Sequence, residues 1–319
     1  MKILLYHWGY YGDIIVVGQN FARELKRRYP SSKIDLMVRP RIKCIEDILD
    51  SLDLFQSFIE GEIEDYNSLK SDYDKHYLID DRVYPEGHLR TIFTHSGFDF
   101  RQHPLKLIFS SEQLKIASEI LGARNRPVIT SQDDMGRKWC PVKSANLQEK
   151  ISGRFELIRL GPNQIHPEVD RKLTFMESCA LISMSDLFFG IDSGIAHGAA
   201  LSGTQTILLP PIHPEFYISP TSYGNPFIAD PKLHHISIKP DTADFCGNFL
   251  CLKSTKKGQL SKPSGTPKEV RCNWRKKYFL FPSNSCYNEI SAETFYNLIL
   301  TTLKNRNLLN QYTENYTYN

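Results

Sequence analysis

The stretch from residue 2 to residue 38 reads KILLYHWGYYGDIIVVGQNFARELKRRYPSSKIDLMV, and its pattern decides the fold class. Lys2–Tyr6 is a short apolar strand, and a glycine-rich turn, Gly9–Asp13, follows it. Apolar residues then recur every three or four positions, which is typical of an amphipathic helix. They are Ile14, Val17, Phe21, Leu25 and Tyr29. Pro30 ends this helix, and residues 34–38 form a second strand. Strand, helix and strand in this order predict a βαβ unit and therefore a parallel sheet.

The same alternation continues along the chain and restarts near residue 127, so the sequence predicts an α/β protein with two facing, doubly wound domains. The expected strands are residues 75–79, 128–130, 155–159, 187–190 and 206–209. The expected helices are residues 43–52, 86–97, 110–122, 142–151, 173–184, 193–202 and 291–303. Residues 210–285 are rich in Pro, Gly, Ser and Lys and are expected to be mostly loops. We expect an N-terminal domain at 1–125, a second at 126–290, and a helix with a tail at 291–319.

Composition excludes several classes of protein. Of the 319 residues, 41% are hydrophobic and 24% are charged, which is ordinary for a globular protein. No window approaches the roughly 18 apolar residues of a membrane-spanning helix, and the short apolar start does not fit an export signal. We therefore expect a cytoplasmic protein that touches a membrane at most peripherally. A net charge of +3 is too small for nucleic acid to be the main partner.

One segment is strongly basic. Residues 253–277 hold nine Lys or Arg and a single acid, Glu269. Two interpretations are open: a solvated loop, or a patch that meets the anionic inner membrane surface or a phosphorylated acceptor.

The most informative stretch for chemistry is residues 188–200, FFGIDSGIAHGAA. A buried strand ends at a short polar turn that opens directly into a helix, whose first backbone N–H groups suit a diphosphate. Asp192 or Ser193 can cap this helix, and Gly194 permits close approach of a ligand. Ser193 and His197 are four residues apart, so both face the same opening of the expected binding site. An ordinary capped helix with a core histidine is the alternative.

Four segments, taken in order, resemble the heptosyltransferases of glycosyltransferase family 9. Asp-Ser-Gly-x-x-His-x-Ala at 192–199, followed by Gly203-Thr204, resembles the donor-site signature of that family. Gly12-Asp13, with the helix that ends in Arg-Arg-Tyr-Pro, resembles its opening. Residues 130–141, TSQDDMGRKWCP, resemble its phosphate-binding loop, and residues 286–293, CYNEISAE, resemble the start of its closing helix. Together the segments span the chain from residue 1 to about residue 303.

This resemblance implies a GT-B architecture, in which two Rossmann-like domains, one for the acceptor and one for the donor, face a central cleft. It also implies inverting sugar transfer without a cofactor or catalytic metal. Inversion needs a base that deprotonates the acceptor hydroxyl as the oxygen attacks the anomeric carbon. Asp13, beside Gly12 in the expected cleft, is the residue that the resemblance assigns as base. A plain helix N-cap is the alternative for Asp13.

The resemblance also implies a set of donor-binding residues. Thr130 and Ser131 would donate hydrogen bonds to phosphate, and a cation would stabilise the leaving diphosphate. The family spacing Lys-x-Trp places Arg137 where a lysine is usual, with Lys138 next to it, so we assign the cation to the two jointly. His213 lies just after a strand end, where a nucleotide contact and a rigid turn are both open. Asp80 and Asp81 end a strand of the first half and face either the acceptor or solvent.

Four late cysteines, Cys246, Cys251, Cys272 and Cys286, fall within one region of the chain. Their spacing lacks the tight Cys-x-x-Cys pair of a zinc knuckle. Family members often carry a cysteine cluster here, some with metal bound, so a structural zinc or iron site and four unligated thiols are both open. A metal there would brace the loops and take no part in the chemistry.

The resemblance implies an inverting glycosyltransferase that moves heptose from ADP-heptose to a hydroxyl of a lipid-linked, lipopolysaccharide-type or other glycan, as in lipopolysaccharide biosynthesis. Two alternatives are open. One is a protein O-glycosyltransferase of the same fold, and the other is a non-catalytic sugar-nucleotide-binding protein.

Overall fold

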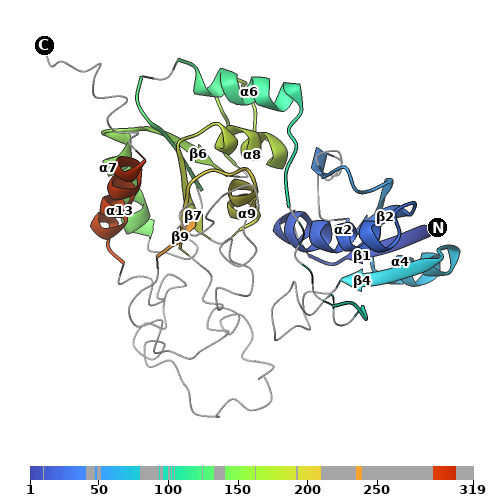
Figure 1. Cartoon of the computed structure of the whole chain (residues 1–319). Coiled ribbons are helices and arrows are strands. Elements are labelled where there is room, and N and C mark those ends of the chain that lie inside the picture. The colour runs from blue at the N-terminus through green and yellow to red at the C-terminus, as the bar shows by residue number, and fades with distance from the viewer. Residues whose placement is uncertain are drawn as a thin grey trace, which may run out of the picture.

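The computed structural model contains two parallel β-sheets, one from each half of the chain, and helices cover both sheets (Figure 1). The structure describes residues 1–9, 11–40, 47–48, 52–79, 93, 96–99, 101, 103, 105–123, 125–132, 141–161, 163–191, 193–209, 235–238 and 290–306. All strand pairs within the two sheets are parallel. The predicted α/β class is therefore confirmed.

The first sheet has four strands in the order β3-β2-β1-β4. β1 (Lys2–His7) lies in its interior, between β2 (Lys33–Val38) and β4 (Lys75–Ile79), and β3 (Ser57–Glu60) adds to the far side of β2. Every residue of β1 except the first is buried, as expected for a parallel strand covered on both faces.

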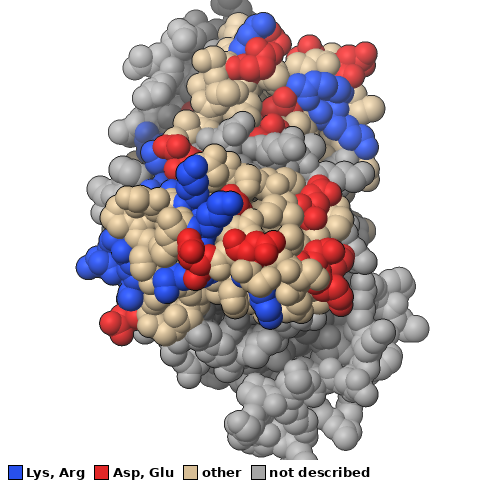
Figure 2. Space-filling view, turned by 90° about the vertical axis from the view of Figure 1, so that its right-hand side faces the viewer, with Lys and Arg blue, Asp and Glu red and all other residues tan. Residues whose placement is uncertain are grey.

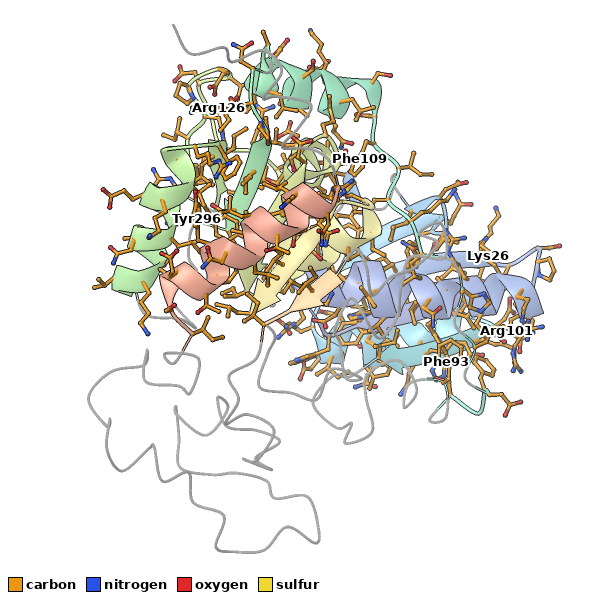
Figure 3. The ribbon with its side chains drawn as sticks, turned by 60° about the vertical axis from the view of Figure 1, so that its left-hand side comes forward. Lys26, Phe93, Arg101, Phe109, Arg126 and Tyr296 are labelled. Atoms are coloured by element: carbon orange, nitrogen blue, oxygen red, sulfur yellow. The ribbon has the colours of Figure 1, made fainter. Side chains whose placement is uncertain are left out.

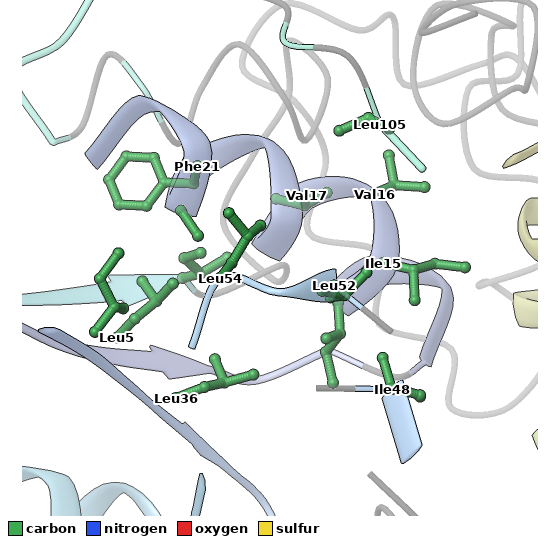
Figure 4. Packing of buried hydrophobic residues seen from close by; sticks show 14 of the residues in the cluster. Leu5, Ile15, Val16, Val17, Phe21, Leu36, Ile48, Leu52, Leu54 and Leu105 are labelled. Carbon is green, nitrogen blue, oxygen red and sulfur yellow. The ribbon is translucent and has the colours of Figure 1, made fainter. Parts of the chain in front are cut away.

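The segment after β1 changes its helical geometry twice. It begins as one turn, α1 (Tyr11–Asp13), widens into a π-helix, η1 (Ile14–Gly18), and continues as α2 (Gln19–Arg28). Phe21 of α2 packs over the sheet residues Leu5 and Leu36 (Figure 4). The apolar spacing predicted one regular helix here. The run Ile-Ile-Val-Val is compatible with either geometry, so the extra residue in each π turn could not be inferred. Single π turns inside α-helices occur often at functional sites.

The other face of the first sheet is covered by α4 (Ile63–Leu69) and the short 3₁₀ helix η2 (Lys70–Asp72). Tyr66 of α4 stacks on Tyr6 of β1, with ring centroids 5.3 Å apart. Neither β3 nor α4 was expected from the sequence. β3 has no buried residue, so its pattern lacks the apolar run of a central strand.

The second sheet has five strands in the order β6-β5-β7-β8-β9. They are β5 (Val128–Gln132), β6 (Glu156–Leu160), β7 (Leu187–Ile191), β8 (Thr206–Leu209) and β9 (His235–Ser237). The first four agree with the predicted strands to within two residues. β9 lies in the region expected to be mostly loops.

Helices cover both faces of the second sheet. α7 (Pro141–Ser152) and α13 (Ala292–Asn305), which carries the labelled Tyr296, lie on one face (Figure 3). There Phe295 packs against Phe189 of β7. α6 (Ser111–Leu121), α8 (Phe175–Ser183) and α9 (Gly194–Leu201) form the core on the other face. α6 precedes the expected domain boundary at residue 125, yet it packs against α8 of the second half.

Each sheet contains one position where the strand order reverses. In the first sheet β1 lies between β2 and β4, and in the second β5 lies between β6 and β7. Open α/β sheets bind ligands outside the carboxyl ends of the strands at such a position. The strand ends that meet there are those of β1 and β4 in the first half and those of β5 and β7 in the second.

Buried polar residues of α2 hold the chain around residues 101–106. Glu24 is 1% exposed and accepts hydrogen bonds from Arg27, Arg28 and His103 at 2.6–2.9 Å. The bond from Arg27, followed by those from Arg28 and His103, holds the pKa of Glu24 at about 2, although burial opposes this shift. Gln19 bonds both the N–H and the carbonyl of Lys106, each at 2.8 Å. This network fixes one side of the segment that starts at Asp13.

The surface shows no extreme of charge on the face that Figure 2 presents, where Lys and Arg share the described area with Asp and Glu. Within the part of the chain that the structure covers, no helix has the length and apolar character needed to cross a membrane.

Candidate functional site

Two strand-to-helix turns, one from each half of the molecule, meet between the sheets. The N-turn (residues 8–9 and 11–13) connects β1 to the π-helix, and the C-turn (residues 191 and 193–194) connects β7 to α9. A Cβ atom added to Gly12 would lie 3.0 Å from the Cα of Gly194 and 2.7 Å from Cδ2 of His197. The two glycines therefore pack backbone against backbone, and a larger residue at position 12 would push the halves apart.

An aromatic pair supports this contact between the halves. Tyr11 stacks on Phe175, the first residue of α8, with ring centroids 5.0 Å apart and an interplanar angle of 13°. A Cβ atom added to Gly194 would meet Tyr11 at 3.3 Å and Phe175 at 3.5 Å. The start of α9 is thus enclosed on one side by residues of both halves, and Asp13 directly follows the glycine that contacts it.

Asp13 lies at this junction with a partly exposed side chain. Its backbone is helical (φ −67°, ψ −38°), and within the described part of the chain its side chain makes no capping hydrogen bond to the π-helix. An N-cap residue has an extended backbone and a side chain that accepts from the helix. Asp13 has neither feature, so the alternative of a plain N-cap does not describe this residue. Its carboxylate instead lies over Gly9, where an added Cβ would be 2.7 Å from Oδ2.

The C-turn is held by a side chain from the neighbouring strand. Oε1 of Gln132, the last residue of β5, accepts from Oγ of Ser193 at 2.9 Å and from the N–H of Ile191 at 3.4 Å. Oγ of Ser193 in turn accepts from the N–H of Ala196 at 3.4 Å, so Ser193 is the N-cap of α9. Its hydroxyl hydrogen is directed at Gln132. Among the described groups of this turn, the backbone amides at the positive end of the helix dipole remain suited to a phosphate.

The two hydroxyl residues of β5 differ in their surroundings, although both are fully buried. Oγ1 of Thr130 lies 3.1 Å from Oγ of Ser185 and 3.3 Å from the carbonyl oxygen of Leu187, to which it donates. It is thus engaged within the second half. Oγ of Ser131 makes no hydrogen bond within the described residues. Of the two, Ser131 keeps the capacity to bond another group.

His197 is 4% exposed and lies one helical turn after Ser193. Its ring contacts the position where Gly12 would carry a side chain. The structure therefore brings together Gly12, Asp13, Ser193, Gly194 and His197, which are five of the residues expected at the site.

Other predicted site residues lie outside the described residues. They are Arg137, Lys138, Asp192, His213, Cys246, Cys251, Cys272 and Cys286, together with Asp80, Asp81 and the basic segment 253–277. Among the described residues there is no group of three or more potential metal ligands. Cys179, which the structure does describe, is a free thiol, and burial raises its pKa.

Sequence reasoning missed three residues that shape the site. Gln132 follows the Thr-Ser pair at the end of a strand beside the reversal of strand order, a place where polar residues are candidates for the site. Gly9 and His7 flank Trp8 after an apolar strand, where the sequence alone gives no indication that one packs against the other.

Comparison with known proteins supplies structures but no sequence relatives, since no family model and no curated protein sequence matches the chain. ADP-heptose lipopolysaccharide heptosyltransferase II of Escherichia coli superposes with a TM-score of 0.60 at 15% identity, covering 96% of this chain and 99% of that one. A family 9 glycosyltransferase from Veillonella parvula gives 0.59 at 13% identity, covering 95% and 97%.

A third similar structure is the dodecameric, iron-containing glycosyltransferase TibC of enterotoxigenic E. coli, with a TM-score of 0.54 at 13% identity. The match covers 96% of this chain and 77% of that one. These identities are low, so the likeness concerns the fold. The chain has the two-domain GT-B fold of the family 9 glycosyltransferases, as the resemblance of its motifs predicted.

Proposed function

We propose that this protein is an inverting glycosyltransferase that transfers heptose from ADP-heptose to a hydroxyl group of a glycan acceptor, with Asp13 as the general base. The observation that carries the proposal is the position of Asp13. Asp13 directly follows Gly12, which packs against Gly194 at the start of α9, and its carboxylate lies over Gly9. This contact supports placing the proposed base and the proposed diphosphate site at the same junction between the halves.

The reaction follows from these two groups. Asp13 takes the proton of the acceptor hydroxyl while the oxygen forms a bond to the anomeric carbon. The bond from that carbon to the diphosphate breaks on the opposite face, and ADP leaves with the bonding electrons. The first amides of α9 stabilise the negative charge that develops on the diphosphate, and Arg137 or Lys138 is the proposed cation. Ser131 is the proposed hydroxyl donor from β5, and His213 is a further candidate for the nucleotide.

The choice of ADP-heptose rests on the solved structures. TibC, of which one structure holds ADP-D-β-D-heptose, superposes on this chain with a TM-score of 0.53 at 12% identity. The proposed acceptor is a lipid-linked glycan of the lipopolysaccharide type, and a protein hydroxyl is the alternative. Whether the four late cysteines hold zinc or iron stays a prediction from the sequence.

Replacement of the base is the most direct test. In Asp13→Asn, transfer from ADP-heptose, followed as ADP release, should fall by about 10²- to 10⁴-fold because proton removal is lost. Binding of ADP should persist, since Asp13 is not assigned to the donor. Asp72→Asn, an exposed acid on η2, is the matched control. An Asp13→Asn enzyme with full activity would refute the assignment.

The donor is tested separately by thermal shift. A ligand at 100 times its dissociation constant adds about 2.7 kcal/mol of apparent stability. ADP-heptose and ADP should each raise the melting temperature, whereas UDP- and GDP-linked sugars should not. Stabilisation by a UDP- or GDP-linked sugar alone would replace ADP-heptose as the donor and leave the role of Asp13 to be decided by the Asn variant.

A further inference from the structure

His7, the last residue of β1, is fully buried and lies against two glycines of the N-turn and the π-helix. Its Nδ1 accepts a hydrogen bond from the N–H of Gly9 at 2.9 Å, in a buried position. A Cβ atom added to Gly9 would meet Cε1 of His7 at 2.7 Å, and one added to Gly18 would meet Cδ2 at 3.2 Å. The ring thus fits closely between the turn and the last residue of the π-helix.

Gly9 is also the residue against which the Asp13 side chain packs. The same added Cβ would lie 2.5 Å from Cβ of Asp13 and 2.7 Å from its Oδ2. The His7 ring and the Asp13 carboxylate therefore both lie against Gly9. A movement of Gly9 would therefore move the surface against which the Asp13 carboxylate packs.

The π-helix links the two contacts of His7. It runs from Ile14 to Gly18, directly after Asp13, and Gln19 bonds back to the carbonyl of Ile14. His7 contacts Gly9 before this segment and Gly18 at its end. One buried ring therefore holds both sides of the short segment that carries Asp13.

The hydrogen bond from Gly9 also fixes the tautomer of His7. A backbone N–H donates, so Nδ1 must be unprotonated, and the ring proton is on Nε2. The N-turn therefore requires a hydrogen-bond acceptor at the δ position of the side chain of residue 7.

We propose that His7 is a positioning residue for Asp13: its Nδ1 fixes Gly9, and Gly9 in turn fixes the carboxylate that removes the acceptor proton. This inference rests on the proposed function of Asp13 as base. It assigns to His7 no contact with either substrate.

Paired variants at position 7 test this role. His7→Phe keeps a planar ring but has no acceptor, whereas Oδ1 of Asn in His7→Asn can occupy the place of Nδ1. We expect the Phe variant to lose about 10- to 100-fold in kcat, because a displacement of about 1 Å is enough for such a loss. The KM for ADP-heptose and the thermal shift with ADP should stay within twofold of the natural protein. His7→Asn should recover most of kcat.

A third variant covers the case in which the Phe protein does not fold. His7→Gln keeps a polar side chain but carries its amide one carbon further out, away from the δ position, and we expect it to lose kcat as the Phe variant does. Wild-type kcat in the Phe or Gln variant, or an Asn variant as impaired as these two, would overturn the proposal. A raised KM for the donor with kcat unchanged would overturn it as well.

Asp13→Asn, assayed in parallel, separates this inference from the proposed function. If Asp13→Asn retains transfer, the base assignment fails whatever the His7 variants do. If Asp13→Asn is inactive while His7→Phe and His7→Gln are fully active, only the inference about His7 fails.

Discussion

The N-turn and the C-turn have the same topology but are built in different ways. Each leads from a buried parallel strand into a helix beside the reversal of strand order in its sheet. The N-turn is held from within its own strand by His7 and opens into a π-helix. The C-turn is held by Gln132 from the neighbouring strand and opens into an α-helix that Ser193 caps.

This difference matches what each turn presents. The N-turn offers one carboxylate, and the orientation of a single side chain is set by close packing against Gly9. The C-turn offers backbone amides, whose alignment is set by the Ser193 cap and by the hydrogen bonds of Gln132. A side chain that lies on a glycine is sensitive to one extra methyl group, whereas amides in a capped helix are sensitive to the loss of a hydrogen bond.

Among the changes that leave Asp13 itself in place, the largest effect is expected from Gly9→Ala. The new Cβ would lie 2.5 Å from Cβ of Asp13 and 2.7 Å from the His7 ring, closer than real Cβ contacts allow, so Asp13 must move. We expect kcat to fall by about 100-fold or more, with donor binding unchanged, as measured by transfer kinetics and calorimetry with ADP.

Gly153→Ala is the matched control for this methyl group, because its Cβ would meet its nearest atoms at 3.7 Å. The control should keep wild-type kcat. A Gly9→Ala enzyme as active as Gly153→Ala would mean that the N-turn does not depend on close packing, and the contrast between the turns would be lost.

An intermediate effect is expected from Gln132→Leu, which acts on the C-turn. The change removes the acceptor of both Ser193 and Ile191, so the turn loses its link to β5. We expect the dissociation constant of ADP to rise by about tenfold, equivalent to about 1.4 kcal/mol, while kcat at saturating donor changes less. Calorimetric titration with ADP measures this, and Gln148→Leu on α7 is the control. Unchanged ADP affinity would remove Gln132 from the donor site.

The sequence predicted most of the regular elements because their local patterns are strong. The apolar strands and amphipathic helices of both halves are examples. The turns after strands that contain Asp13 and Ser193 are further examples. What the sequence could not supply depends on contacts between distant residues. The Gly12–Gly194 contact joins positions 182 residues apart in the numbering, and Gln132 reaches Ser193 across 61 residues. The π-helix was hidden for another reason, since four consecutive apolar residues satisfy either helical geometry.

The smallest effect, and the one that separates the two turns most cleanly, is expected from Ser193→Ala. The change removes the N-cap of α9 and should lower the free energy of unfolding by about 1 kcal/mol, as measured by denaturant titration. Transfer should stay within about threefold of the natural protein, because the amides remain in place. Asp13→Asn should do the reverse, because among the described residues the Asp13 side chain makes no capping bond to the π-helix: we expect transfer to be lost with little change in stability. If Ser193→Ala abolished transfer without loss of stability, its hydroxyl would have to act on the donor itself, and the C-turn would present a side chain after all.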